Sequence, residues 1–244
     1  MSSGKFRLDV ALVERGLIDS REKARRAIMA AQVLVNGHAV TKPGTPVAAD
    51  VPITLVAKEK FVGRGGFKIE AALDAFAVDP SGRICADIGA STGGFTDCLL
   101  QRGAARVYAL DVGHGQLDWR LRQDPRVVVR EGINARFLSP EDFVPRPSLV
   151  VADVSFISLT LILPPAFALL DAEADMVVLI KPQFELSRAE VGRGGIVRDD
   201  ASRDRAVGKI RAFVAASGHR WLGSMASPIT GRDGNVEFLA HLKP

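Results

Sequence analysis

The residues best suited to chemistry begin with a glycine-rich stretch, residues 84–97, which reads ICADIGASTGGFTD. A short apolar run there leads into Asp87, and three glycines follow at the start of an expected helix: Gly89, Gly93 and Gly94. A strand, a glycine-rich turn and a helix N-terminus together form the usual layout of a nucleotide-cofactor site. Glycine also permits positive φ and a close approach between backbone and ligand.

The spacing of these glycines separates the candidate cofactors. A dinucleotide fingerprint reads G-x-G-x-x-G, whereas this turn reads G-x-x-x-G-G. Such a turn suits an adenosyl and amino-acid ligand better than a pyrophosphate, so S-adenosylmethionine (AdoMet) is the leading cofactor and NAD a weaker one. An ordinary glycine-rich turn without a ligand remains an alternative.

Charged residues stand at the C-terminal ends of the expected strands, namely Asp87, Asp111, Asp153 and Lys181. In an open α/β sheet this edge forms the ligand crevice. Asp111 follows Gly89 by 22 residues, a position from which a carboxylate can bind the ribose hydroxyls of an adenosyl group. Lys181 precedes a proline, which directs the chain away from the strand.

Strands and helices that could position these residues alternate after a glycine-rich joint at residues 61–66. Near-continuous apolar strands that alternate with helices indicate a buried, mostly parallel sheet, here of seven strands. We expect helices at 67–78, 94–101, 159–170 and 201–217, and strands at 84–90, 106–111, 127–129, 149–153, 176–181, 221–227 and 236–241.

The first quarter of the chain indicates a small α+β module. A short helix is expected from Arg7 to Gly16, and Ser20 is expected to cap a second helix that runs to about Ala31. A hairpin follows at residues 33–40, around an Asn-Gly turn, and a further strand pair near residues 51–56 completes the module.

The formal charge of +4 lies entirely in this module. Residues 1–62 hold ten Lys/Arg and six Asp/Glu, which leaves 22 of each sign in the remainder. A basic module joined to a neutral body suggests a polyanionic partner, although a surface charged only for solubility is the alternative.

Other classes of protein are disfavoured. Two cysteines, Cys85 and Cys98, and four histidines without paired spacing argue against a disulfide framework or a metal centre. The start of the chain lacks the apolar region of a secretory signal. The most apolar helical stretch, residues 157–170, contains two prolines and is too short to span a bilayer. We therefore expect a cytoplasmic protein.

The N-terminal module resembles an S4 RNA-binding domain. The resemblance rests on Arg-Leu-Asp at 7–9, Ser-Arg-Glu-Lys-Ala at 20–24 and Val-x-Val-Asn-Gly at 33–37. This sequence has Ala31-Gln32 where the family usually has Gly-Lys. The resemblance implies that basic side chains contact RNA, mostly at phosphates. These side chains are Arg7, Arg21, Lys23, Arg25 and Arg26, with Arg64 in the joint.

The rest of the chain resembles the FtsJ/RrmJ-type RNA ribose 2′-O-methyltransferases, and most closely the TlyA (hemolysin A) family, which joins an S4 domain to such an enzyme. The matching strings are GGFKIE at 65–70, DIGASTGGFT at 87–96, ADVSFIS at 152–158, KPQFE at 181–185, GGIVRD at 194–199 and GNVEF at 234–238. The family's catalytic tetrad then falls on Lys68, Asp153, Lys181 and Glu237.

This resemblance implies a Rossmann-like AdoMet-dependent methyltransferase that acts on cytidine 2′-hydroxyls of ribosomal RNA, with Lys181 as the candidate base. Asn134 is either an adenine contact or a turn residue. The alternatives are an rRNA-binding assembly factor without catalysis and, more remotely, a membrane-lytic protein. We expect an S4-like domain at 1–60, a linker at 61–66 and a methyltransferase domain at 67–244. The implied cofactor contacts are Asp87, Gly89, Ser91, Gly93, Gly94, Phe95, Asp111, Val112, Asn134 and Asp153.

Overall fold

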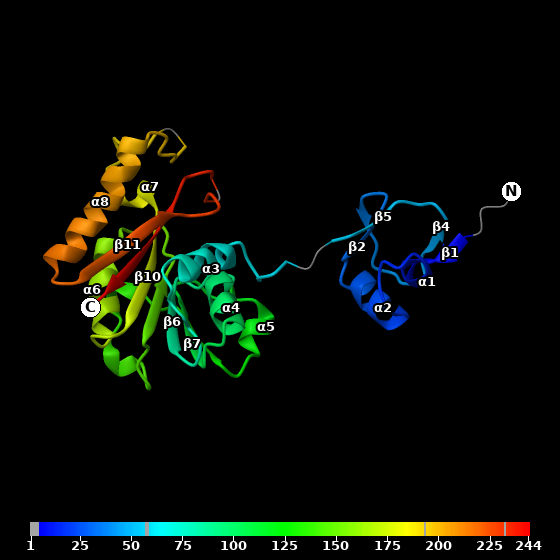
Figure 1. The fold of residues 1–244 in the computed structure, drawn as a ribbon, viewed down its shortest axis with the longest axis horizontal. Helices are drawn as coiled ribbons and strands as arrows, with labels where there is room; N and C mark the ends of the chain where they lie inside the picture. The colour runs from blue at the N-terminus through cyan, green and yellow to red at the C-terminus, as the bar shows by residue number, and fades with distance from the viewer. Residues whose placement is uncertain (1–4, 57–58, 193, 232) are drawn as a thin grey trace. The chain divides into compact units, whose positions relative to one another are not determined.

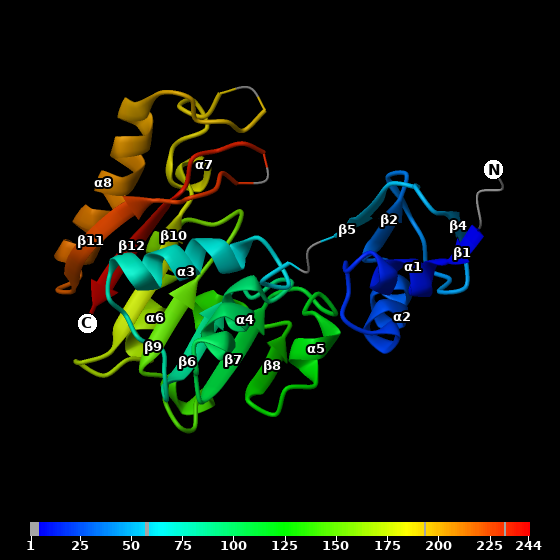
Figure 2. The same cartoon turned by 45° about the vertical axis from the view of Figure 1, so that its right-hand side comes forward.

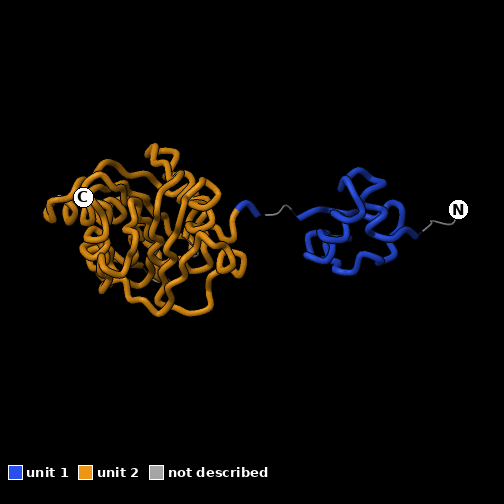
Figure 3. The backbone as a smooth tube through the Cα atoms, turned by 90° about the horizontal axis from the view of Figure 1, so that it is seen from below, with its two compact units in different colours: residues 1–60 blue, residues 61–244 orange. Residues whose placement is uncertain are grey.

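The computed structural model of the chain describes residues 5–56, 59–192, 194–231 and 233–244. Residues 1–4 lie outside these ranges. They belong to the segment for which the sequence predicts no secretory signal. The chain divides into two compact units, residues 1–60 and 61–244 (Figure 3). Residues 61–66, expected as a linker, fall within the second unit, where Phe61 is buried in the core.

The first unit packs two helices beside short antiparallel strands. Its three-stranded sheet has the order β3-β2-β5, and β1 pairs separately with β4. The elements are β1 (Lys5–Arg7), α1 (Leu8–Glu14), α2 (Arg21–Met29), β2 (Val33–Val35), β3 (His38–Ala39), β4 (Pro46–Ala48) and β5 (Ile53–Leu55).

Local signals in the sequence account for most of this unit. The Ser20 hydroxyl accepts a hydrogen bond from the Lys23 backbone N–H, as expected of an N-cap. The expected hairpin is present, with Asn36 and Gly37 both at positive φ. Ala31 also takes a left-handed φ of 56° just after α2, at the position where the family usually has glycine.

The second unit is built on a seven-stranded sheet of order β11-β12-β10-β9-β6-β7-β8. The pairs from β10 through β8 are parallel, and β12 runs antiparallel to both of its neighbours. The strands are β6 (Ile84–Ile88), β7 (Arg106–Asp111), β8 (Val127–Glu131), β9 (Leu149–Ala152), β10 (Asp175–Ile180), β11 (Arg220–Ala226) and β12 (Phe238–Lys243).

Helices cover both faces of this sheet (Figures 1 and 2). Alternate side chains of the central strands pack in two separate apolar clusters, one with α6 and α8 and the other with α3, α4 and α5. This architecture confirms the predicted Rossmann-like fold. The helices are α3 (Gly65–Ala75), α4 (Gly94–Gln101), α5 (Trp119–Arg122), α6 (Leu163–Ala168), α7 (Pro182–Glu185) and α8 (Asp200–Ala216).

The prediction of one continuous helix at residues 159–170 was wrong. Residues Leu159–Leu161 form a 3-10 turn, and α6 begins at Leu163 with prolines in its first turn. Because proline has no N–H to donate, it is tolerated only at the start of a helix. Within the described ranges, no helix is both long and apolar enough to cross a bilayer.

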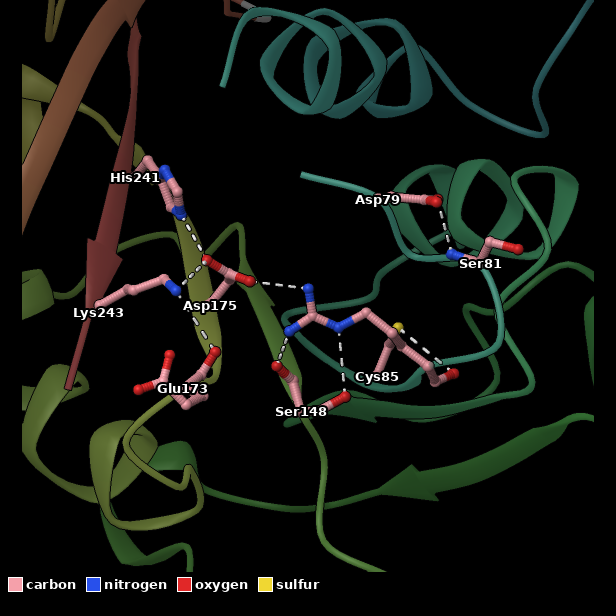
Figure 4. A network of polar contacts seen from close by, with 9 residues as sticks. Asp79, Ser81, Cys85, Ser148, Glu173, Asp175, His241 and Lys243 are labelled. Atoms are coloured by element: carbon pink, nitrogen blue, oxygen red, sulfur yellow. Dashed lines mark hydrogen bonds and ion pairs between the residues drawn. The ribbon is translucent and has the colours of Figure 1, made fainter. Parts of the chain in front are cut away.

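A polar network ties the strands together at the edge opposite the glycine-rich turn (Figure 4). The Asp175 carboxylate accepts hydrogen bonds of 2.8 Å from both Arg83 and His241, and Lys243 lies 3.7 Å away. Arg83 also donates to the backbone oxygen of Ser148. Burial alone would raise the pKa of Asp175, but these hydrogen bonds outweigh it and hold the pKa below its usual value.

We expect Asp175→Asn to lower the free energy of unfolding by about 2 kcal/mol at pH 7, because buried His241 and partly buried Arg83 lose a charged acceptor. A carboxyl with a depressed folded pKa stabilises the fold above its unfolded pKa, and this contribution is lost as pH falls through the folded pKa. Denaturant titrations should therefore show the two proteins converging below about pH 4. Asp171→Asn, at an exposed carboxylate, is the control. An equal difference at all pH values would contradict this account.

Candidate active site

Two glycines fix the turn between β6 and α4. Gly89 has φ +87°, and a Cβ there would lie 2.4 Å from the backbone oxygen of Asp153. Gly93 has φ +98°, and its Cβ would lie 2.2 Å from the Leu121 side chain. A side chain at either position would therefore displace its neighbours, so the turn requires glycine. It also brings the end of β6 against the end of β9.

Asp87 is buried beneath this turn. Its Oδ2 accepts a 2.6 Å hydrogen bond from the Thr96 hydroxyl, whereas Oδ1 has no hydrogen-bond partner among the described residues. Burial raises the pKa of Asp87 to about 7. A buried acceptor without a donor indicates that a ligand or water supplies one. The ammonium group of AdoMet is a donor of suitable charge.

Asp111, at the end of β7, is held by two backbone amides. Ser91 donates to Oδ2 at 2.8 Å, and Gly113 donates to Oδ1 at 2.7 Å. Each carboxylate oxygen can accept a further hydrogen bond, so Asp111 still fits a ribose diol. Val112, next to it, is 71% exposed. Asn134 caps a 3-10 turn by accepting from the Arg136 N–H, which is the turn role considered above.

A cleft of about 410 Å³ opens beside the turn. It brings together all four tetrad residues, several of the expected cofactor contacts, and Arg64. Asp87, Gly93, Asp111, Val112 and Asn134 do not line it. The lining residues are Arg64, Gly65, Lys68, Gly89, Ala90, Ser91, Thr92, Gly94, Phe95, Asp153, Lys181 and Glu237.

The tetrad forms two ion pairs. Lys68 Nζ lies 2.5 Å from Glu237, with side chains only 10% and 4% exposed. Lys181 Nζ lies 2.5 Å from Asp153. Lys68 comes from α3, whereas Asp153, Lys181 and Glu237 lie immediately beside the ends of β9, β10 and β12. Glu237 precedes β12, so its expected place inside the last strand was wrong.

Two residues near the tetrad were missed at the sequence level. The Ser155 hydroxyl accepts a 2.9 Å hydrogen bond from Lys181. Glu185 is 4% exposed and accepts from the Ser158 hydroxyl at 2.5 Å and the Leu159 N–H at 2.8 Å. Glu185 thus joins α7, which follows Lys181, to the loop that follows Asp153. Ser155 lies in the family-like segment 152–158 and Glu185 in the family-like segment 181–185. Their place in these segments is the signal that could have identified them.

Arg64 lies in the second unit, whereas the other expected RNA contacts lie on the first. Arg7 and Arg21 both bind Asp9. Lys23 of α2 pairs with Asp19, which lies just before the helix, and Arg26 pairs with Glu22 on the helix; all four of these side chains are exposed. Arg25 is also exposed on this helix.

We predict that the affinity for AdoMet falls about tenfold for each pH unit below 7. In the cofactor-binding role expected of it, Asp87 must lose its proton to receive a cationic ligand, and burial raises its pKa to about 7. Calorimetric titration between pH 5.5 and 8.5 measures this dependence. Asp87→Asn should bind AdoMet more weakly at pH 8 and without the pH dependence. A wild-type affinity that is flat across this range would contradict the role of Asp87.

Comparisons with known proteins identify both units. Residues 61–244 match the FtsJ-like methyltransferase family, and residues 6–52 match the S4 domain. A candidate rRNA methyltransferase of Bacillus subtilis, YqxC, is 51% identical over 99% of this chain and 87% of its own length. The 16S/23S rRNA (cytidine-2′-O)-methyltransferase TlyA of Mycobacterium tuberculosis is 47% identical over 98% of this chain and 90% of its own length. A solved structure of a candidate hemolysin from Streptococcus thermophilus is 44% identical, covers 99% of this chain and 89% of its own, and superposes with a TM-score of 0.75.

Proposed function

The chain belongs to the FtsJ-like methyltransferase family and carries an S4 domain, and on that basis we propose that it methylates the ribose 2′-oxygen of cytidine in ribosomal RNA. The M. tuberculosis relative is named for this activity on 16S and 23S rRNA. The observation that carries the proposal is the pair of lysine–carboxylate contacts in one cleft with the glycine-rich turn. The cofactor is AdoMet, and the place of action is the cytoplasm, where ribosomal subunits are found.

AdoMet, when bound, supplies a methyl group on a positively charged sulfur, which keeps the S–C electron pair as the new O–C bond forms. The turn at Gly89, together with Asp87 and Asp111, would hold this cofactor. The protein's remaining task is to place the ribose hydroxyl in line and take its proton. Positioning of this kind supplies a large part of many rate accelerations.

Lys181 is the residue that takes the proton. Its Nζ lies in the cleft with only 11% of the side chain exposed, fixed by Asp153 and by Ser155. A base must reach the proton that it removes, and a lysine held from two sides has a defined position. To act as the base, Lys181 first releases its ammonium proton to solvent, and its free amine then accepts the proton of the 2′-hydroxyl as the new O–C bond forms. The Lys68–Glu237 pair also lines the cleft, where it would orient the ribose.

Exposed side chains near the cleft suit an RNA substrate. Phe156, one residue beyond Ser155, is 90% exposed, and its ring centroid lies 5.2 Å from that of Phe184. Single-stranded bases commonly stack on such rings. Arg64 lines the cleft and can meet a phosphate.

Two alternative functions make different experimental predictions. An assembly factor without catalysis would bind rRNA and AdoMet yet transfer no methyl group, although it has no need of two lysine–carboxylate ion pairs in one cleft. A membrane-lytic protein would release dye from liposomes.

Tritiated AdoMet incubated with unmodified 30S and 50S subunits tests the proposal. We expect incorporation into RNA and no liposome leakage. No incorporation into either subunit, with AdoMet binding verified, would support the assembly factor instead.

A further inference from the structure

The first unit contains a carboxylate that is completely buried beside two arginines. The Asp9 side chain is 0% exposed. Arg7 binds it with two parallel hydrogen bonds of 3.0 Å, from Nε to Oδ1 and from Nη2 to Oδ2. Arg21 donates from Nη2 to the same Oδ2 at 3.3 Å. One acidic group thus joins arginines that are 14 residues apart in the sequence.

Backbone pairing fixes the positions of these side chains. Arg7 ends β1, opposite Pro46 of β4, and the Asp9 N–H donates to the Pro43 oxygen at 3.0 Å. Arg21 begins α2, which packs on α1 through the core around Leu8 and Ile28. The backbone at each arginine is therefore fixed by neighbouring elements, and Asp9 joins the two guanidinium groups.

Among the described residues, both arginines keep N–H donors that Asp9 does not use. The guanidinium group has five N–H donors; Arg7 uses one on Nε and one on Nη2 for Asp9, and Arg21 uses one on Nη2. Their side chains are 55% and 61% exposed. The Arg7 guanidinium holds the pKa of Asp9 below its usual range, so the cluster carries a net charge of +1.

We propose that Asp9 assembles Arg7 and Arg21 into one binding site for a phosphate group of RNA, with Asp9 as a positioning residue that does not touch the ligand. Because both guanidinium groups are already bound to Asp9, their side chains lose little conformational freedom when a phosphate binds. This inference rests on the proposed RNA substrate. Arg7 and Arg21 are already expected to contact RNA; the inference adds that Asp9 holds the two arginines together as one site.

The ion pairs on α2 differ from this cluster and supply the control. Asp19 is 85% exposed where it pairs with Lys23, and such a surface pair fixes neither side chain. Asp9→Asn and Asp19→Asn each raise the charge of the same unit by one. If charge alone governs binding, both variants bind RNA more tightly. If Asp9 positions the arginines, Asp9→Asn binds more weakly although its charge has become more favourable.

The experiment measures binding of the full chain to an unmodified 23S rRNA fragment across a range of salt concentrations. For Asp9→Asn we expect about tenfold weaker binding and a salt slope smaller by about 0.7–0.9, which corresponds to one lost phosphate contact. Asp19→Asn should bind at least as tightly as the wild type. Partial unfolding would lower the apparent affinity without this change in slope.

A second variant covers the case in which Asp9→Asn unfolds the first unit. Arg7→Lys keeps the charge but cannot form the two parallel bonds to Asp9, and we expect the same loss of affinity and slope. Unchanged or tighter RNA binding by folded Asp9→Asn, unchanged binding by Arg7→Lys, or a wild type that does not bind RNA would overturn the inference. AdoMet binding and methyl transfer, measured separately, report on the second unit, so a failure of the proposed function is distinguishable.

Discussion

Replacing Lys181 with alanine is expected to lower the rate of methyl transfer at least a thousandfold, roughly the upper part of the range for a lost general base. The affinity for AdoMet should stay within about threefold of the wild type, because the turn at Gly89 and the Asp87 carboxylate are untouched. The fold should survive, since the Asp153 side chain is 22% exposed and can be hydrated once its partner is removed. Single-turnover rates and calorimetric binding provide the two measurements.

A second variant separates the charge of Lys181 from its role as a base. Lys181→Arg preserves a cation beside Asp153, but a guanidinium does not lose its proton at neutral pH. We expect it to be as inactive as the alanine variant. Ser155→Ala removes one hydrogen bond to Lys181 and should cost only about tenfold in rate. Activity in Lys181→Arg near the wild-type level would exclude the proton-accepting role, and a parallel loss of AdoMet affinity would assign Lys181 to cofactor binding.

Replacing Gly89 with alanine is expected to abolish AdoMet binding and to destabilise the second unit by several kcal/mol. The new Cβ would lie 2.4 Å from the Asp153 backbone oxygen, which belongs to the main chain and cannot rotate away. The chain must shift there, and strain at positive φ adds to the cost. Thermal unfolding and AdoMet titration measure both effects.

Gly218→Ala is the matched control for Gly89→Ala. Gly218 has a similar φ of +79°, but a Cβ there would meet nothing within 4 Å. Its substitution carries only the backbone strain, about 1 kcal/mol, and should leave AdoMet binding intact. Equal effects of the two substitutions would show that close contact at Gly89 is unimportant.

The sheet could be predicted from the sequence because its strands are buried on both faces. Near-continuous apolar runs ending in polar residues mark β6, β7 and β10, and the expected bounds of β7 and α4 match the structure. The shortest helices and strands show no such apolar pattern in the sequence. The four-residue helices α5 and α7 contain too few positions to show a period, and β1 and β4 depend on pairing across residues 5–48.

The candidate site could be predicted in its residue types but not in its pairings. Lys68 and Glu237 are 169 positions apart, and nothing in either segment indicates that this lysine meets that carboxylate. The same holds for Asp9, an acidic residue in a basic module, whose burial depends on how α1, α2 and the β1–β4 pair pack. Such contacts follow from tertiary packing, which local patterns do not encode.

The central claim is that this cleft transfers methyl groups to ribose, with Lys181 as base. Nucleoside mass spectrometry of unmodified ribosomal subunits, after incubation with AdoMet and either the wild type or Lys181→Ala, tests it most directly. We predict 2′-O-methylcytidine with the wild type and none with the variant. A methyl group found on a base, or the same ribose product made by Lys181→Ala, would contradict the account.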